Sequence, residues 1–269
     1  MWSKIELVKD RSEIEHPAVR AALEMLDIED GVEIHHDGDL PARSGVGSSS
    51  AFAVGLLHAL HALKGELVGP ERLAEEAIRL ERDILAEPVG CQDQLLCALG
   101  GLRLITWEPG GAWRADPVPL APGILRAFEE RLLLVYTGPR RDGAAPILPA
   151  GQNSAALARI QEMPRQGVEC LAAADWVGFG ALLESAWREK QSLAAGIVTR
   201  EIADLCLRLH WEGATATKLM GSGGGGFLLV FAEPDRWGSI LLAVDGMVTV
   251  PVRFAGRGSE LIHYEAVSV

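Results

Sequence analysis

Five of the six residues from 221 to 226 are glycine, and the strongly apolar segment FLLVFAE follows them directly. Glycine loses more backbone entropy on folding than any other residue, so such a run is unfavourable unless something close to the backbone compensates. A flexible loop is the alternative, but it fits poorly between the Lys-Leu-Met segment before the run and the apolar strand expected after it. We therefore expect a ligand or another backbone segment to approach residues 221–226 closely.

The composition is that of a globular protein, which does not need disulfides or bound metals to be stable. The chain has 269 residues, of which 48% are hydrophobic and 23% charged, and this length is ample for one large or two modest domains. Twenty-five basic against thirty-seven acidic side chains leave a formal net charge of −12. That sign argues against binding to nucleic acid or to an anionic membrane. Any phosphate must then be bound by local groups.

Nothing in the sequence indicates secretion or membrane insertion. The first residues are charged throughout and lack the apolar core of a signal peptide. The longest apolar stretch, AFAVGLLHALHAL, contains two histidines and is short of the roughly 20 residues needed to cross a bilayer. The four cysteines form no CxxC pair and the seven histidines show no metal-binding spacing, so we interpret both as ordinary surface or core residues. A cytoplasmic location is expected.

The hydrophobic patterns predict mixed helix and strand with no internal repeat. Strands are expected at residues 4–8, 31–40, 131–138, 227–233, 248–254 and 260–267, with a hairpin at 101–118. Helices are expected at residues 16–26, 51–63, 70–87, 153–173, 175–193 and 199–212. A proline-bearing stretch at about 119–128 marks a boundary, so the sequence predicts an α+β fold with domains at 1–122 and 123–269.

A first candidate site is the segment PARSGVGSSSAFAVG, in which glycines and serines directly precede a helix. Unpaired N–H groups and the positive end of the helix dipole bind anions, and a serine hydroxyl can ligate Mg²⁺. A serine N-cap after a glycine turn explains the same residues without a ligand, and this segment alone leaves both interpretations open. It matches neither the Walker A loop nor the dinucleotide-binding fingerprint.

A second candidate site lies on and after the helix that begins at Pro70. Glu81 falls on the same apolar stripe as Ala74 and Ile78, and a buried carboxylate must be paired or bound to metal. Glu81 is therefore a candidate Mg²⁺ ligand, with a buried hydrogen-bonded glutamate or a boundary position as the alternative. Asp93 begins a further short helix, where an acidic residue in the first turn is favoured in any case.

Taken together, these segments resemble the GHMP kinases, the superfamily of galactokinase, homoserine kinase, mevalonate kinase and phosphomevalonate kinase. PARSGVGSSSA is similar to the second motif of that family and KLMGSGGGGF to its third, while AEPVGCQDQLLCALGG and YTGPRR resemble the branch that phosphorylates heptose 7-phosphate. The resemblance runs from about Lys4 to the C-terminus. It implies an N-terminal domain like domain 2 of ribosomal protein S5 and a ferredoxin-like C-terminal domain.

The resemblance also implies roles for individual residues. ATP would contact Pro41, Gly45, Val46, Gly47, Ser48, Ser49, Ser50, Lys218, Gly221, Ser222, Gly223, Gly224 and Gly225. Ser49 and Glu81 would hold Mg²⁺, and Asp93 would accept or orient the proton of the acceptor hydroxyl. The substrate would contact Arg141, Gln92 and Gly224, with Arg141 on its phosphate because a guanidinium fork suits three oxygens.

The match to the family has one large and two small departures. The family's first motif, a strand and loop of the Gly-Gly-Gly-Thr-Asp type, has no counterpart here. We therefore expect an incomplete first domain whose sheet exposes an unpaired edge or is covered by a partner chain. Val46 replaces the usual leucine and Ser222 the usual alanine, changes that a phosphate loop can accept.

The first functional hypothesis is an ATP- and Mg²⁺-dependent kinase acting on a sugar or sugar phosphate, with the anomeric hydroxyl of heptose 7-phosphate as acceptor. A non-catalytic, nucleotide-binding remnant of a sugar kinase is the alternative, favoured by the missing motif. An RNA-binding module ranks last because of the acidic charge. The expected partners are small molecules, without nucleic acid or membrane, and a homodimer is left open.

Overall fold

The computed structural model describes residues 4–29, 31–41, 44–108, 110–139, 154–194 and 196–265, which divide into two compact units. Unit 1 comprises Met1–Ala42, Gly47–Arg103 and Ala255–Val269, and unit 2 comprises Arg43–Val46 and Leu104–Phe254. The boundary expected at residue 122 stays a prediction, because compactness alone does not define a segment that folds by itself.

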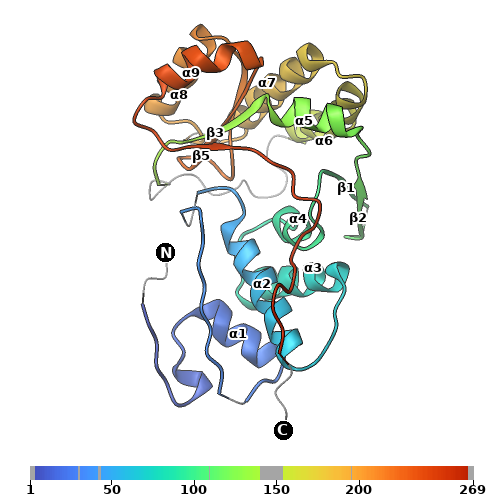
Figure 1. Cartoon of the computed structure of the whole chain (residues 1–269), viewed down its shortest axis with the longest axis vertical. Helices are drawn as coiled ribbons and strands as arrows, with labels where there is room; N and C mark the ends of the chain where they lie inside the picture. The colour runs from blue at the N-terminus through green and yellow to red at the C-terminus, as the bar shows by residue number, and fades with distance from the viewer. Residues whose placement is uncertain are drawn as a thin grey trace. The chain divides into compact units, whose positions relative to one another are not determined.

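Unit 1 is built from helices (Figure 1). They are the 3-10 helix η1 (Arg11–Glu13), α1 (Pro17–Met25), α2 (Ser48–Leu63), α3 (Pro70–Ile78), the π-helix η2 (Arg79–Ile84) and α4 (Gln92–Leu99). Helix α2 starts after Gly47 and stops at Gly65, both in the left-handed region that glycine tolerates. Pro70 occupies the first turn of α3, where its missing N–H is harmless. Leucines from α2, α3, η2 and α4 pack together in its fully buried core.

Three of the expected strands, at residues 4–8, 31–40 and 260–267, are wrong. The described part of each segment, which ends at residue 265 in the third, is irregular. Ile5, Leu7 and Ile262 are 96%, 98% and 97% exposed. Alternation of apolar and polar residues determines which side chains would share a face of a strand. A strand forms only when a neighbouring strand hydrogen-bonds its N–H and C=O groups. No described residue pairs with these segments as a strand. The expected unpaired edge in the first domain stays a prediction.

Residues 255–265 belong to unit 1 and lie against helices formed much earlier in the chain. Gly101 N donates to Ala255 O at 2.6 Å, and His58 Nδ1 lies 2.9 Å from Ser259 Oγ. The closest approach is at Gly258, where an added Cβ would lie 2.1 Å from Ala98 O. Unit 1 is thus assembled from three separate stretches of sequence.

Replacing Gly258 by alanine is expected to destabilise the protein by about 2 kcal/mol, because backbone atoms of α4 occupy the space of the new methyl group. The matched control is Gly256→Ala, since a Cβ at Gly256 meets nothing within 4 Å. Urea unfolding followed by circular dichroism measures both changes. Equal unfolding midpoints for the two variants would contradict the close packing at Gly258.

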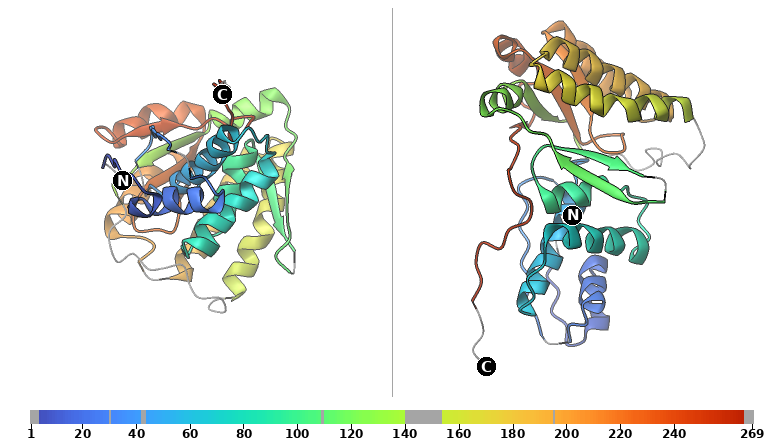
Figure 2. Two further views of the ribbon diagram at one scale, coloured as in Figure 1. Left: turned by 90° about the horizontal axis from the view of Figure 1, so that it is seen from below. Right: turned by 90° about the vertical axis from the view of Figure 1, so that its right-hand side faces the viewer.

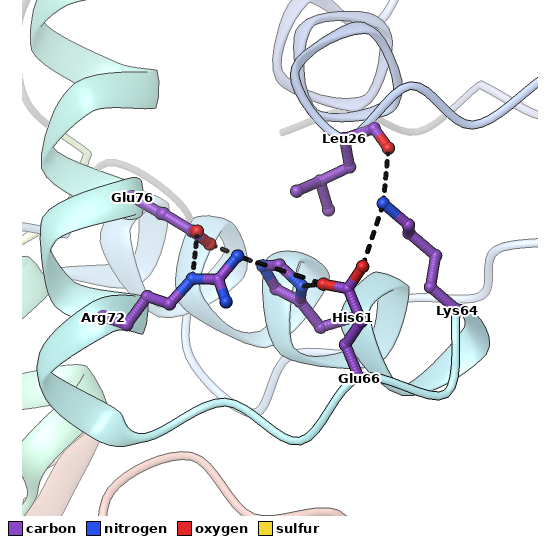
Figure 3. A network of polar contacts seen from close by, with 6 residues as sticks. All are labelled: Leu26, His61, Lys64, Glu66, Arg72 and Glu76. Carbon is purple, nitrogen blue, oxygen red and sulfur yellow. Dashed lines mark hydrogen bonds and ion pairs between the residues drawn. The ribbon is translucent and has the colours of Figure 1, made fainter.

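His61 is a buried histidine that ties α2 to α3 (Figure 3). Its Nδ1 lies 2.8 Å from Glu66 Oε2 and its Nε2 lies 2.6 Å from Glu76 Oε2. Each ring nitrogen of His61 therefore has a carboxylate oxygen as its partner. Hydrogen bonds from His61 and then Lys64 lower the pKa of Glu66, and Arg72 Nε donates to Glu76 at 2.8 Å. His61 is thus a satisfied core histidine, one of the two ordinary roles, surface or core, expected for the histidines.

Unit 2 contains a four-stranded antiparallel sheet in the order β4-β5-β3-β6. The strands are β3 (Leu132–Tyr136), β4 (Ala214–Leu219), β5 (Phe227–Ala232) and β6 (Thr249–Pro251). The helices are α5 (Pro122–Glu129), α6 (Ser154–Ala172), α7 (Trp176–Leu193), α8 (Arg200–Trp211), the 3-10 helix η3 (Pro234–Arg236) and α9 (Trp237–Ala243). Helices α6 and α7 lie side by side (Figure 2). Helices α7 and α8 also contact β4.

The remaining strands of unit 2, β1 (Arg103–Trp107) and β2 (Trp113–Pro117), form the expected hairpin, although Arg103 itself is counted with unit 1. The structure also confirms the helices predicted for unit 2, which are α6, α7 and α8, with ends shifted by a few residues. Strands β3, β5 and β6 are confirmed in the same way. Strand β4 and helices α5 and α9 were not predicted. The core of the unit is formed where apolar residues of the sheet meet α7, α8 and α9.

Candidate functional site

The boundary between the two units falls between Val46 and Gly47, inside the serine- and glycine-containing loop of the first candidate site. The two halves of this loop therefore belong to different units. Residues 47–50 begin α2 in unit 1, and residues 44–46 lie in unit 2.

In unit 1, the Glu81 carboxylate is 2% exposed and is bound by three side-chain donors. Ser49 Oγ donates to Oε1, while Ser50 Oγ and Gln94 Nε2 donate to Oε2 at 2.7 and 2.5 Å. The donors come from α2 and α4, so one carboxylate joins three helical segments. The inward direction predicted for Glu81 is confirmed, and the structure brings it together with Ser49 as expected. Its role as a metal ligand stays a prediction.

Glu81 lies on the π-helical segment Arg79–Ile84, where the sequence pattern predicted a regular α-helix. Leu85 N donates to Leu80 O at 3.0 Å, five residues back, which is the wider turn of a π-helix. Such single wide turns are rare and occur frequently at functional sites.

Asp93 lies in the first turn of α4, and its carboxylate is close to the N-terminus of α2. A Cβ added to Gly47 would lie 3.4 Å from Asp93 Cγ and 3.6 Å from Oδ2. Burial, and then the negative charge of Glu81, raise the pKa of the Asp93 carboxyl above its usual value. The structure therefore places two carboxylates and a helix N-terminus in one neighbourhood.

The donor chemistry of this neighbourhood fits Mg²⁺. Glu81, Asp93 and Ser49 offer only oxygen atoms, which this cation prefers. Within the part of the chain that the structure describes, no group of three His, Cys, Asp or Glu side chains could hold a metal. Mg²⁺ commonly uses one or two carboxylates together with waters and substrate phosphates, so a site with few protein ligands is compatible with this ion.

In unit 2, residues 44–45 pack backbone to backbone against the glycine loop, residues 220–226. Phe227 N donates to Ser44 O at 2.9 Å. A Cβ on Gly226 would lie 2.3 Å from Ser44 O, and one on Gly221 would lie 2.6 Å from Gly45 Cα. The close backbone approach expected at residues 221–226 is confirmed. Contact of this loop with a nucleotide stays a prediction.

Other predicted site residues are distributed over both units. Gly223 packs on Ile197, and Gly224 N donates to Ile197 O at 3.0 Å. Gly224 and Gly225 line a cavity of about 220 Å³ together with Thr137, Thr199 and Arg208. Half-buried positions are found for Pro41, Val46, Ser48, Lys218 and Ser222, whereas Gln92 is exposed. Arg141 lies outside the described residues.

Two family models match the chain. The model of the GHMP kinase N-terminal domain matches residues 13–101, and that of the GHMP kinase C-terminal domain matches residues 168–245. Together they span more than half of the sequence. The chain belongs to the GHMP kinases.

Relatives of this GHMP kinase include sugar kinases. The chain is 25% identical over 218 residues to the D-glycero-alpha-D-manno-heptose 7-phosphate kinase of Campylobacter jejuni, covering 78% of this chain and 64% of that protein. It is 27% identical over 213 residues to the bifunctional fucokinase/GDP-fucose pyrophosphorylase of Arabidopsis thaliana, covering 76% of this chain and 20% of that protein. The chain therefore spans less than two thirds of the length of either relative.

The two-domain fold of this GHMP kinase is also found in solved structures. The crystal structure of a D-glycero-D-manno-heptose 1-phosphate kinase from Bacteroides thetaiotaomicron matches with a TM-score of 0.73 at 22% identity, covering 91% of this chain and 73% of that one. The predicted α+β, two-domain GHMP kinase fold is confirmed. Among the residues described, no helix is both long and apolar enough to span a membrane.

Sequence reasoning missed two polar residues of this GHMP kinase. Gln94 bonds Glu81 from the buried face of α4, and its position beside Leu95 in an amphipathic helix was the available signal. Lys190 on α7 donates from Nζ to Leu219 O and Gly221 O at the glycine loop. Nothing in the local sequence around Lys190 indicates a partner about thirty residues away.

Proposed function

We propose that this GHMP kinase transfers the γ-phosphate of ATP to a hydroxyl of a sugar or sugar phosphate, and that the acceptor is the anomeric hydroxyl of a heptose 7-phosphate. The observation that carries the proposal is the Glu81 carboxylate, held by Ser49, Ser50 and Gln94 beside Asp93 at the N-terminus of α2. Similarity to a heptose 7-phosphate kinase supports the choice of acceptor.

Catalysis of phosphoryl transfer depends mainly on positioning the reacting groups and on neutralising the charge of the phosphate oxygens. The backbone N–H groups of residues 48–50, at the start of a long helix, would bind phosphate oxygens. Ser49 and Glu81 would hold Mg²⁺, which when bound neutralises charge on the phosphate oxygens. The Asp93 carboxylate would accept the proton of the acceptor hydroxyl or align that hydroxyl.

The glycine-rich segments would complete the nucleotide site. Residues 45–47 and 221–225 carry side chains only at Val46 and Ser222, so phosphate and ribose could approach their backbone closely. The N–H of Gly224 is the exception, because it already donates to Ile197 O. Gln92 and Gly224 would contact the acceptor, and Arg141 would bind its phosphate, because a guanidinium group suits phosphate oxygens. Four free cysteines suit the reducing cytoplasm in which ATP is the phosphate donor.

A nucleotide-binding protein without transfer activity is the second candidate. It is favoured by the irregular segments 4–8 and 31–40, whose exposed apolar side chains include Ile5 and Leu7. Catalysis depends on precise placement of the acceptor, since a misplacement of about 1 Å can lower the rate about 10²-fold, whereas nucleotide binding does not need the acceptor in place.

Two measurements test the proposal. A thermal shift with Mg-ATP reports nucleotide binding, because ligand at 100 times its Kd stabilises the folded state by roughly 2.7 kcal/mol. A coupled assay of ADP release with a panel of sugars and sugar phosphates then reports transfer. We expect binding and turnover, with heptose 7-phosphate as the best acceptor. Nucleotide binding without turnover on any acceptor would establish the second candidate. Absence of both nucleotide binding and turnover would reject both candidate functions.

A further inference from the structure

The two oxygens of the Glu81 carboxylate have different surroundings. Oε2 accepts hydrogen bonds from Ser50 Oγ at 2.7 Å and from Gln94 Nε2 at 2.5 Å, and both donor residues are buried. Oε1 accepts a hydrogen bond from Ser49 Oγ, and Ser49 is exposed in the first turn of α2. One carboxylate oxygen is therefore held by two donors in the interior of unit 1, whereas the other faces an exposed serine.

Gln94 is a buried amide whose bond to Glu81 is made by its N–H group. An ionised carboxylate only accepts hydrogen bonds, so it binds the NH₂ end of the amide and not the carbonyl end. Among the described residues, none donates to Gln94 Oε1, which is buried as well. A buried carbonyl oxygen without a donor is unfavourable, and an apolar side chain of the same size would avoid that cost. The favourable contribution of the amide at this position is thus its bond to Glu81.

The hydrogen bonds determine which oxygen of Glu81 is left for a cation. A carboxylate offers about two acceptor positions on each oxygen. Ser50 and Gln94 occupy both positions of Oε2, whereas Ser49 occupies one position of Oε1. The remaining acceptor position of the carboxylate therefore lies on Oε1, next to the hydroxyl oxygen of Ser49. These are the two side chains that would hold Mg²⁺ in the proposed function.

We propose that Gln94 is a positioning residue, which together with Ser50 holds Oε2 of Glu81 in the core and leaves Oε1 available to Mg²⁺ beside Ser49. The inference rests on the proposed function and adds to it a residue that acts through Glu81. Groups that orient a metal-binding side chain typically change metal affinity or activity about 10–100-fold when they are removed. The role of Gln94 can therefore be measured on metal-dependent binding, without catalysis.

The test compares the binding of a non-hydrolysable ATP analogue in the presence of Mg²⁺ and in the presence of EDTA, by isothermal titration calorimetry. The metal factor is the Kd in EDTA divided by the Kd in Mg²⁺. Gln94→Met keeps the approximate size of the side chain and removes the amide, and it is expected to lower the metal factor about tenfold. A residue with a merely structural role would change both Kd values together and leave their ratio as it is.

The matched control is Leu95→Val, at the buried position next to Gln94 on α4. The smaller apolar side chain leaves a cavity and lowers the unfolding midpoint in urea, but it removes no hydrogen bond from Glu81. Its metal factor is expected to equal that of the wild type. Ser50→Ala removes the other donor to Oε2 and is expected to lower the metal factor in the same direction as Gln94→Met. Circular dichroism verifies folding, and Ser50→Ala decides the question if Gln94→Met does not fold.

The possible results separate the positioning role from the kinase activity. A folded Gln94→Met protein with the metal factor of the wild type would overturn the positioning role, and so would an equal fall in Leu95→Val. A wild-type protein whose nucleotide binding does not respond to Mg²⁺ would also overturn it, because Glu81 would then hold no cation. A lowered metal factor in a chain that shows no turnover on any acceptor would support the positioning role and reject the proposed kinase activity.

Discussion

Replacing Asp93 by asparagine is expected to lower turnover by ~10²–10⁴-fold, the usual contribution of a positioned acid or base, while Mg-ATP binding changes little. The carboxylate lies beside Gly47 at the start of α2, where an acceptor hydroxyl would meet the phosphate. Asparagine keeps the shape and removes the proton acceptor. The measurements are steady-state ADP release for kcat and a thermal shift for nucleotide binding.

The Asp93→Asn variant also separates chemistry from stability. Burial and Glu81 raise the pKa of the Asp93 carboxyl, so the folded protein disfavours its ionised form and is destabilised by it above that raised pKa. The variant is therefore expected to unfold no more easily than the wild type at neutral pH. In the wild type, activity is lost on the acid side as pH falls through the raised pKa. The control Asp83→Asn changes an exposed carboxylate on the π-helix, and equal turnover for the two variants would remove Asp93 from the site.

Replacing Gly226 by alanine is expected to destabilise the protein by about 3 kcal/mol and to weaken Mg-ATP binding. The residue has φ of +100°, and its Cβ would lie 2.3 Å from Ser44 O. Relief of that overlap would displace Ser44 and break the hydrogen bond from Phe227 N. The unfolding midpoint in urea and the shift with Mg-ATP measure the two effects.

The matched control for this change is Gly238→Ala. Gly238 lies inside α9, and a Cβ there meets nothing within 4 Å. Alanine in a helix is favoured over glycine by about 1 kcal/mol, so this variant is expected to be at least as stable as the wild type. A Gly226→Ala protein with the midpoint and nucleotide response of the control would show that Ser44 and the glycine loop do not require their close packing.

Local sequence rules predicted the features that depend on one segment alone. The burial of Glu81 follows from helical periodicity, and the ends of α2 and α3 follow from Gly65 and Pro70. The close approach to residues 221–226 follows from the entropy that glycine loses. Strand β4 was missed because its small alternating residues, ATATKL, show little hydrophobic contrast.

Features that depend on partners distant in sequence were not predictable in this way. The pattern at residues 4–8 suits a strand, but pairing needs a neighbour that no local rule supplies. Gln94 meets Glu81 across 13 positions, and Lys190 meets Gly221 across 31. The wide turn at Arg79–Ile84 was not predictable either, since the segment RLERDI is ordinary helical sequence.

The packing of residues 255–265 against α4 and the residues that follow it has a consequence for biosynthesis. The helices of unit 1 leave the ribosome early, yet Ala98 and Gly101 receive their backbone partners only after more than 150 further residues have been translated. Throughout that interval the early helices lack part of their packing and are exposed to chaperones and proteases. Unit 1 can therefore complete this packing only once residues 255–265 have left the ribosome, later than the residues of unit 2 that precede them.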